Sequence, residues 1–171
     1  IDGTNIRLSW DYQLKKVSIG GRTDNAQIPA DLIQFLLSLC DVSRFERSFP
    51  DVDAVIYGEG YGAGIQKGGS LSKTKTFAMF DVLVGDKWWL DRDNVSDVSN
   101  KLSIPEVPYI GRFSLDTAID MVRNGFDSAL GEHPKAEGLV GRPLSTLFDK
   151  KMSRIIVKLK TKDFGGVKGG E

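Results

Sequence analysis

The chain has 171 residues, of which 40% are hydrophobic and 27% are charged, proportions that are typical of one globular domain. Its 23 basic residues balance 23 acidic ones, so net charge gives no general attraction to nucleic acid or membranes, and either would need a local patch. The single cysteine, Cys40, excludes an internal disulfide and a cysteine metal cluster and favours a reducing compartment, the cytoplasm. No apolar run reaches the length of a membrane span.

The N-terminal part of the chain predicts a hairpin and then a helix. Residues 5–10 alternate between apolar and polar as a strand does, and a second strand ends at Gly20-Gly21. Pro29 suits the first turn of a helix whose apolar positions lie at 32–39.

The middle of the chain predicts strands on either side of a glycine-rich loop. Residues 52–57 form a strand pattern, and residues 58–69 hold six glycines in twelve positions, which predicts a loop. Residues 76–84 and 87–90 predict a hairpin that turns at Gly85-Asp86.

Two capping residues predict helices further along. Asn94 is a candidate cap for a helix that runs to about Lys101, and Ser114 is a candidate cap for a helix that ends near Gly125.

The C-terminal part returns to strands, at 136–140 and 155–159, before a glycine-rich tail or linker at 165–171. Because strands outnumber helices and come in hairpins, we predict an α+β fold with mainly antiparallel sheets and flanking helices. The expected domain covers residues 1–164.

The first candidate for chemistry is the opening run Asp2-Gly3-Thr4-Asn5. A glycine in a loop beside a reacting group lets the backbone approach a phosphate closely. Asp-Gly is also a common turn, so this run by itself leaves both interpretations open.

Glu59 lies in the second candidate, the glycine-dense run 57–69. Such a loop after a strand can wrap a nucleotide with its backbone N–H groups, and a carboxylate at the strand end can accept sugar hydroxyls or hold a metal. The run matches neither the P-loop nor the dinucleotide-binding pattern. A surface loop without a ligand is the alternative.

The third candidate is the aromatic strand 77–82. Its alternation places Phe80 and Val82 on one face and Phe77 and Met79 on the other. Aromatic residues on strands usually pack in a core, but a face that opens onto a cleft can stack a purine.

Charged residues on the late strands are the fourth and fifth candidates. Glu137 stands among apolar residues, where a carboxylate is costly unless it is paired or binds a cation. Lys158 and Lys160 project from the same face of the last strand. They fit either a solvated strand face or a clamp on a phosphate.

In chain order, these runs resemble a set of motifs that covers residues 1 to about 164. Asp-Gly, Gly-Glu-Gly, Phe-Asp-Val, Glu-Gly-Leu-Val and Lys-Leu-Lys follow motifs I, III (in two parts), IV and V of the covalent nucleotidyltransferases, the superfamily of polynucleotide ligases and capping enzymes. Motif I of that superfamily reads Lys-x-Asp-Gly, and its lysine amine accepts the nucleotide. We expect this lysine immediately before Ile1, outside the chain.

Within that superfamily, the chain resembles ATP-dependent RNA ligases of the phage nick-sealing type, because Gly3-Thr4-Asn5 fits their motif I. DNA ligases and capping enzymes usually have arginine where Asn5 stands. The resemblance implies a nucleotidyltransferase core, similar to ATP-grasp ligases, that uses ATP and Mg²⁺ to form a lysyl-AMP. The AMP would pass to an RNA 5′-phosphate, which is then sealed to a 3′-hydroxyl. Two alternatives stay open: a non-catalytic module that binds nucleotides or RNA ends, and a DNA ligase core.

The same resemblance implies roles for individual residues. Lys158 and Lys160 would contact the α-phosphate, and Glu137 would act in catalysis together with the metal. The residues expected to bind the nucleotide are these two lysines with Asp2, Gly3, Asn5, Arg22, Glu59 and Phe80.

Within this set, Glu59 is expected to hold the sugar and Phe80 to stack on adenine, with Phe77 as the second choice. Asn5 is expected to act in the RNA-handling steps, and Arg22 near the phosphate.

One stretch departs from the neutral balance of the chain. Residues 149–171 hold seven basic residues against three acidic ones, and this is the part we expect to face RNA. The expected partners are RNA 5′-phosphate and 3′-hydroxyl ends, with no membrane, and we expect a monomer.

Overall fold

The computed structural model describes residues 1, 3–23, 25–66, 68–131 and 135–164. The chain divides into two compact units, a larger one of residues 2–107 and a smaller one of residues 108–171 together with Ile1. Asp2 and the tail 165–171 lie outside the described residues. A single domain over residues 1–164 therefore stays a prediction.

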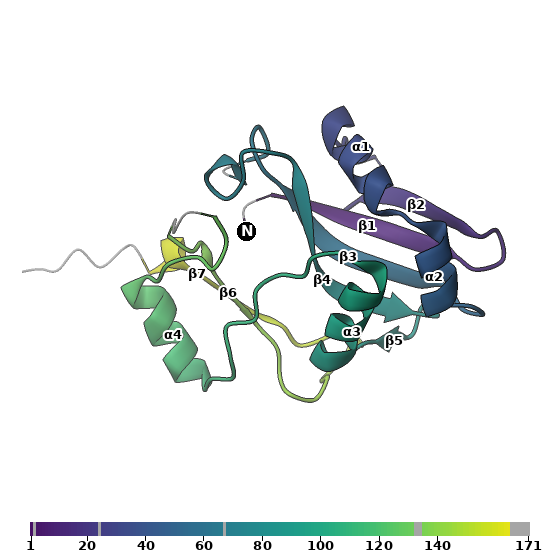
Figure 1. Ribbon diagram of the computed structural model, residues 1–171. Coiled ribbons are helices and arrows are strands. Elements are labelled where there is room, and N and C mark those ends of the chain that lie inside the picture. Colours follow the sequence, from purple (N-terminus) through teal and green to yellow (C-terminus); the bar gives the residue numbers. More distant parts are fainter. Residues whose placement is uncertain (2, 24, 67, 132–134, 165–171) are drawn as a thin grey trace, which may run out of the picture. The chain divides into compact units, whose positions relative to one another are not determined.

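The larger unit is built on an antiparallel sheet with the strand order β2-β1-β3-β4-β5 (Figure 1). Its strands are β1 (Thr4–Asp11), β2 (Lys16–Gly21), β3 (Ala54–Tyr61), β4 (Thr76–Val84) and β5 (Trp88–Trp89). Both predicted hairpins are confirmed, since β1 pairs with β2 and β4 pairs with β5.

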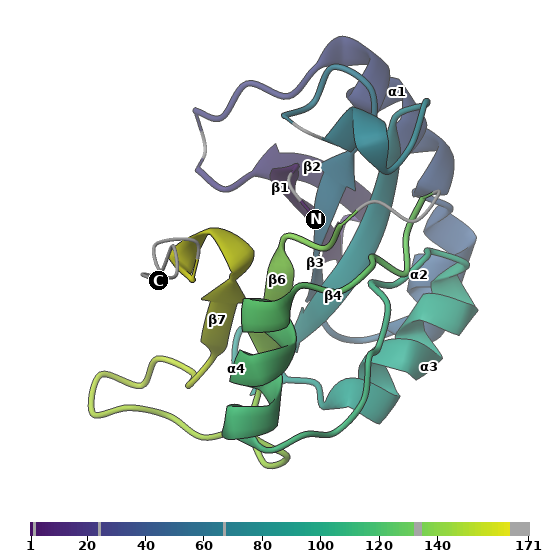
Figure 2. The same ribbon diagram turned by 90° about the vertical axis from the view of Figure 1, so that its left-hand side faces the viewer.

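Helices cover one face of this sheet, as Figure 2 shows. They are α1 (Ala30–Leu39), α2 (Val42–Ser48) and α3 (Arg92–Leu102). The predicted cap of α3 was wrong, because the Asp91 side chain accepts the Asn94 N–H. Sequence patterns did not predict α2, although the side chain of Asp41 caps it by accepting the N–H groups of Ser43 and Arg44.

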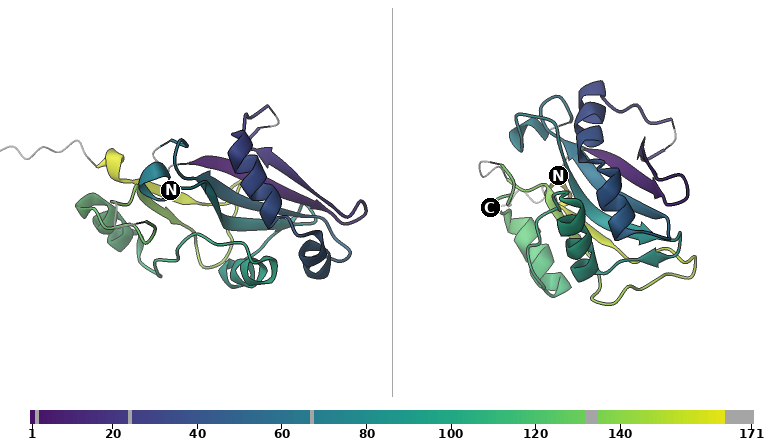
Figure 3. Two further views of the ribbon diagram at one scale, coloured as in Figure 1. Left: turned by 45° about the horizontal axis from the view of Figure 1, so that its top comes forward. Right: turned by 45° about the vertical axis from the view of Figure 1, so that its right-hand side comes forward.

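The core of the larger unit lies between the sheet and these helices (Figure 3). Every second residue of β1 contributes to it, and Ile6, Leu8 and Trp10 are almost wholly buried. Leu32 of α1 and Phe45 of α2 pack against the same cluster. The sheet therefore has one helix-covered face, and its other face carries the alternate residues of each strand.

A β-bulge at Phe80 changes the predicted faces of β4. Tyr57 pairs with Asp81 while the next residue of β3, Gly58, pairs with Met79, so Phe80 is the extra residue. An extra residue reverses the alternation along a strand. The prediction that Phe80 and Val82 share a face was wrong, since Val82 joins Met79 in the core.

The smaller unit contains α4 (Leu115–Asn124), the antiparallel pair β6 (Gly138–Gly141) and β7 (Val157–Lys160), and a short 3-10 helix, η2 (Thr161–Asp163). The predicted cap of α4 is confirmed, because Ser114 accepts the Thr117 N–H. Contacts join α4 to both strands.

In the part of the chain that the structure describes, no helix is long and apolar enough to cross a membrane.

Candidate functional site

Two residues of the predicted nucleotide site are direct neighbours in the larger unit. Asn5 of β1 lies opposite Glu59 of β3 in the antiparallel ladder, and directly opposite residues project from the same face of a sheet. That face is the one not covered by helices, because the adjacent residue Ile6 is buried in the core. The fold thus brings Asn5 of the first motif run beside Glu59 of the second.

Glu59 lies within a strand, so the predicted loop at 58–69 was wrong over its first four residues. Strand β3 continues to Tyr61 because its glycines make room for packing. A Cβ atom at Gly58 would lie 2.3 Å from Cζ of Phe77, and one at Gly60 would lie 2.7 Å from Cδ2 of Leu32. These two glycines admit core side chains, and Glu59 between them points to the opposite face.

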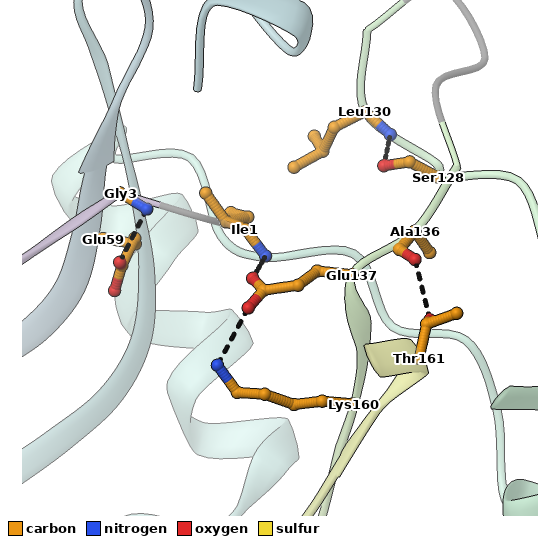
Figure 4. A network of polar contacts seen from close by, with 9 residues as sticks. All are labelled: Ile1, Gly3, Glu59, Ser128, Leu130, Ala136, Glu137, Lys160 and Thr161. Atoms are coloured by element: carbon orange, nitrogen blue, oxygen red, sulfur yellow. Dashed lines mark hydrogen bonds and ion pairs between the residues drawn. The ribbon is translucent and has the colours of Figure 1, made fainter. Parts of the chain in front are cut away.

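Gly3 reaches Glu59 through its backbone (Figure 4). The Gly3 N–H donates to Oε1 of Glu59 at 3.1 Å. A Cβ atom at Gly3 would lie 2.3 Å from the carbonyl oxygen of Gly60. The neighbouring strand therefore leaves no space for a side chain at position 3.

The two aromatic candidates have different environments. Phe77 has no exposed surface and belongs to the core, so the second choice for the adenine stack is not available to a ligand. Phe80 is half-buried and stands at the bulge. Bulges re-aim side chains and are common beside active sites.

Two arginine residues of the larger unit, Arg22 and Arg7, also differ in environment. Arg22 is exposed and follows directly after β2. Arg7 is half-buried, and its Nε donates to the carbonyl oxygen of Gly21 at 2.8 Å.

Sequence reasoning ranked Arg7 below the other candidates and gave no role to Tyr57 and Asp81, which also lie near Asn5 and Glu59 on the open face. Arg7 lies opposite Tyr57, and Tyr57 lies opposite Asp81, which is 2% exposed. The signal that identifies the first two was present in the sequence, since they follow Asn5 and precede Glu59 by two positions. The position of Asp81 depends on the bulge.

In the smaller unit, Glu137 and Lys160 form an ion pair. Nζ of Lys160 donates to Oε1 of Glu137 at 2.8 Å, and the backbone nitrogen of Ile1 lies 4.0 Å from Oε2 (Figure 4). The side chains of Glu137 and Lys160 remain 36% and 41% exposed. Thr161 holds the backbone beside this ion pair, because its N–H donates to the Glu137 carbonyl and its hydroxyl donates to the Ala136 carbonyl.

The pairing of β6 with β7 positions the residues around this ion pair. Lys160 lies opposite Gly138 and Lys158 opposite Val140. Gly138 has a φ of +156°, and a Cβ atom there would lie 1.9 Å from the carbonyl oxygen of Leu159. Lys158 is exposed and, among the described residues, has no acidic partner within ion-pair distance. It lies two residues from Lys160 along β7, so both side chains leave the strand on one face, as predicted.

Comparisons with solved structures define the class of this fold. A complex of a Naegleria gruberi RNA ligase variant with AMP and Mn matches with a TM-score of 0.72 and 17% identity over 96% of the chain. Naegleria gruberi RNA ligase with PPi matches with a TM-score of 0.69 and 18% identity, also over 96% of the chain. The chain spans 48% of the length of each. At this identity the likeness shows a ligase fold.

The sequence also matches the model of the RNA ligase family over residues 1–160, and the chain belongs to that family. A comparison with curated proteins found no match.

Proposed function

We propose that the chain is the nucleotidyltransferase core of an ATP-dependent RNA ligase. In this proposal, a lysine immediately before Ile1 takes AMP from ATP and releases pyrophosphate, the AMP passes to an RNA 5′-phosphate, and a 3′-hydroxyl then displaces the AMP to seal the strand. The observation that carries the proposal is the family match, because it spans residues 1–160 and thus every residue assigned below. The Naegleria gruberi structures with ATP and Mn, with AMP and Mn and with PPi support it.

Cationic groups have a clear task in this reaction. Negative charge grows on the α-phosphate oxygens when the lysine attacks, and fixed cationic donors stabilise that charge. We assign this task to Lys158 and Lys160, and the exposed ammonium group of Lys158 is available to an anion. The attacking amine must be neutral, so neighbouring cations also favour the reaction by lowering its pKa.

The nucleoside would be bound by the open face of the larger unit. Asn5 and Glu59 present an amide and a carboxylate side by side, which suits hydrogen bonds to sugar hydroxyls. Phe80 is the proposed adenine stack, and Arg22 is a proposed phosphate contact.

The residues present fit a Mg²⁺ ion that the protein and the nucleotide coordinate together. No group of three or more His, Cys, Asp or Glu side chains suited to a metal occurs among the described residues. Mg²⁺ characteristically uses only one or two carboxylates, with phosphate oxygens and water completing its shell. Glu137 is the carboxylate we assign to it. When bound, the metal would neutralise phosphate charge.

A direct test is to extend the chain upstream with a lysine before Ile1, add ATP and Mg²⁺, and measure the mass of the protein. A gain of one AMP is expected, and an alanine at the same position should prevent it. No gain with any divalent metal would overturn the proposal and favour a non-catalytic binding module.

The substrate requires a second measurement. Sealing of nicks with RNA ends should exceed sealing of nicks with DNA ends in the extended protein. The reverse preference would indicate a DNA ligase core. The monomeric state and an intracellular location, where ATP is available, stay predictions.

A further inference from the structure

The connection between β6 and β7 is a highly exposed segment of the smaller unit. Residues 144–153, here called the tip segment, are exposed without interruption. The tip segment carries large apolar side chains that water contacts, namely Leu144 (78% exposed), Leu147 (50%), Phe148 (42%) and Met152 (75%). Several large apolar side chains exposed within one short segment make it a candidate place for a partner to bind.

The tip segment is also basic, in a chain whose charges cancel. The tip segment holds two basic residues, Lys150 and Lys151, against one acidic residue, Asp149, and Arg142 and Arg154 flank it in the sequence. Lys150 and Lys151 have no acidic partner within ion-pair distance among the residues the structure describes. Lys150 and Lys151 belong to the stretch 149–171 that was expected to face RNA, and in the tip segment they lie among exposed apolar side chains.

Asp149, the acidic residue of the tip segment, builds the turn. Its Oδ1 accepts the N–H groups of both Lys151 and Ser153 at 2.8 Å. Backbone hydrogen bonds close the hairpin on either side, from Asp149 to Ser153 at 2.8 Å and from Ile155 to Leu147 at 2.8 Å. The tip is thus an ordered turn whose lysines project from a fixed backbone.

The combination of exposed apolar side chains and unpaired lysines indicates the kind of partner that the tip segment binds. An apolar protein surface would leave the two unpaired ammonium groups without counter-charges. An RNA strand supplies both complements, since phosphates pair with lysines and unstacked bases and sugars cover apolar and aromatic side chains. We propose that the tip segment is a docking surface for a single-stranded stretch of the RNA substrate, an inference that rests on the proposed function.

The proposed contacts between the lysines and phosphates are tested by the salt dependence of RNA binding. The double variant Lys150→Gln/Lys151→Gln is compared with the unaltered chain by fluorescence anisotropy of a labelled single-stranded RNA over a salt series. Each lost phosphate contact lowers the slope of log K against log salt by about 0.7 for a single strand, so a decrease of about 1.4 is expected. A slope equal to that of the unaltered chain would overturn the proposal.

A matched control separates local contact from net charge. Lys16 and Lys87 are exposed lysines of the larger unit without an acidic partner within ion-pair distance among the described residues. The variant Lys16→Gln/Lys87→Gln changes the total charge by the same amount. It should leave the slope unaltered, and an equal decrease in both double variants would contradict a docking surface at the tip.

The proposed contact between RNA bases and the apolar side chains is tested with the variant Phe148→Ala, and Trp88→Ala is the control. Trp88 is an aromatic residue of the larger unit that is 72% exposed. Loss of one stacking contact should weaken RNA binding about 5- to 150-fold, whereas Trp88→Ala should not weaken it, and circular dichroism must show both variants folded. If Phe148→Ala leaves RNA affinity unaltered but abolishes self-association in sedimentation, the surface binds protein and the proposal fails.

This test is separable from that of the proposed function. Failure of the extended, unaltered protein to take up AMP contradicts the ligase proposal without changing the slope measurement. Uptake of AMP together with unaltered RNA binding in the Lys150→Gln/Lys151→Gln variant contradicts only the docking surface.

Discussion

Gly58 of β3 lies against the ring of Phe77 on the neighbouring strand, so closely that a Cβ atom at position 58 would come within 2.3 Å of Phe77 Cζ. Phe77 is fully buried and cannot turn into solvent to make room. This contact explains why a glycine-rich run forms a strand, and the strand in turn places Glu59 on the open face.

Substitution Gly58→Ala should therefore destabilise the larger unit by about 1–3 kcal/mol, because overpacking a filled core forces strain on its neighbours. Urea unfolding measures the change. Gly141→Ala is the control, since no atom lies within 4 Å of a Cβ atom built there. Equal stabilities of the two variants would contradict this account of β3.

The carboxylate of Glu106 should make stability depend on pH. Hydrogen bonds from the Arg92 guanidinium, one of them 2.9 Å long from Nη2 to Oε1, lower the pKa of Glu106. A lowered pKa in the folded state favours folding above the unfolded value of about 4.3, and this contribution is lost as the pH falls through the folded pKa.

We expect Glu106→Gln to lower the free energy of unfolding at pH 7 by about 0.5–1 kcal/mol, because the pair is partly exposed. The difference from the unaltered chain should shrink as the pH falls from about 4.3 through the lowered pKa of the folded state, below which both states bind the proton. Urea unfolding at several pH values measures it. A difference that is constant from pH 7 to pH 3 would show that the charge of Glu106 contributes nothing.

Lys160 should matter far more for the reaction than for the fold. Its ion pair with Glu137 is 36–41% exposed, and such pairs contribute about 0.2–1 kcal/mol. Loss of a donor to the developing phosphate charge should reduce AMP uptake by about 10²- to 10³-fold. Lys160→Gln in the lysine-extended protein, with melting temperature and AMP uptake both measured, is the test.

Lys135→Gln provides the matched control for that variant. Lys135 also belongs to the smaller unit and pairs with Asp127 at 2.7 Å, with 79% of its side chain exposed. It should retain the normal rate of AMP uptake. Equal losses in the two variants would indicate a general effect of charge.

Cys40 should react slowly with thiol reagents. The thiol is half-buried, and burial raises its pKa to about 11. Since the thiolate is the reactive form, labelling at pH 8 should be roughly two hundredfold slower than for a thiol with a pKa of 8.5. The labelling rate from pH 7 to pH 11 measures this, and labelling in urea supplies the reference. Equal rates in the folded and unfolded chain would exclude the protection.

Local patterns in the sequence predicted much of the fold. The hairpins β1–β2 and β4–β5 and the Ser114 cap of α4 were found because alternation and capping depend on neighbouring residues. Helix α2 was missed because its seven residues offer too few repeats for a helical period to stand out. The loop predicted at 58–61 was wrong because the packing of distant side chains decides it.

The candidate site divides in the same way. Motif order pointed to Glu137 and Lys160, and their ion pair in the smaller unit agrees with a common task. The faces of β4 were not predictable, because the bulge at Phe80 arises from the register with β3 and a one-residue shift exchanges the two faces of a strand.

The sequence by itself determined the family, the class of fold and the candidate site residues, since these depend on the order of side chains along the chain. Only the tertiary structure decided which of those residues are neighbours. It placed Asn5 opposite Glu59, buried Phe77 while leaving Phe80 at a bulge, and raised a basic, apolar tip between β6 and β7. The physical reason is that strand register and burial depend on the close packing of side chains remote in sequence, which no local pattern records.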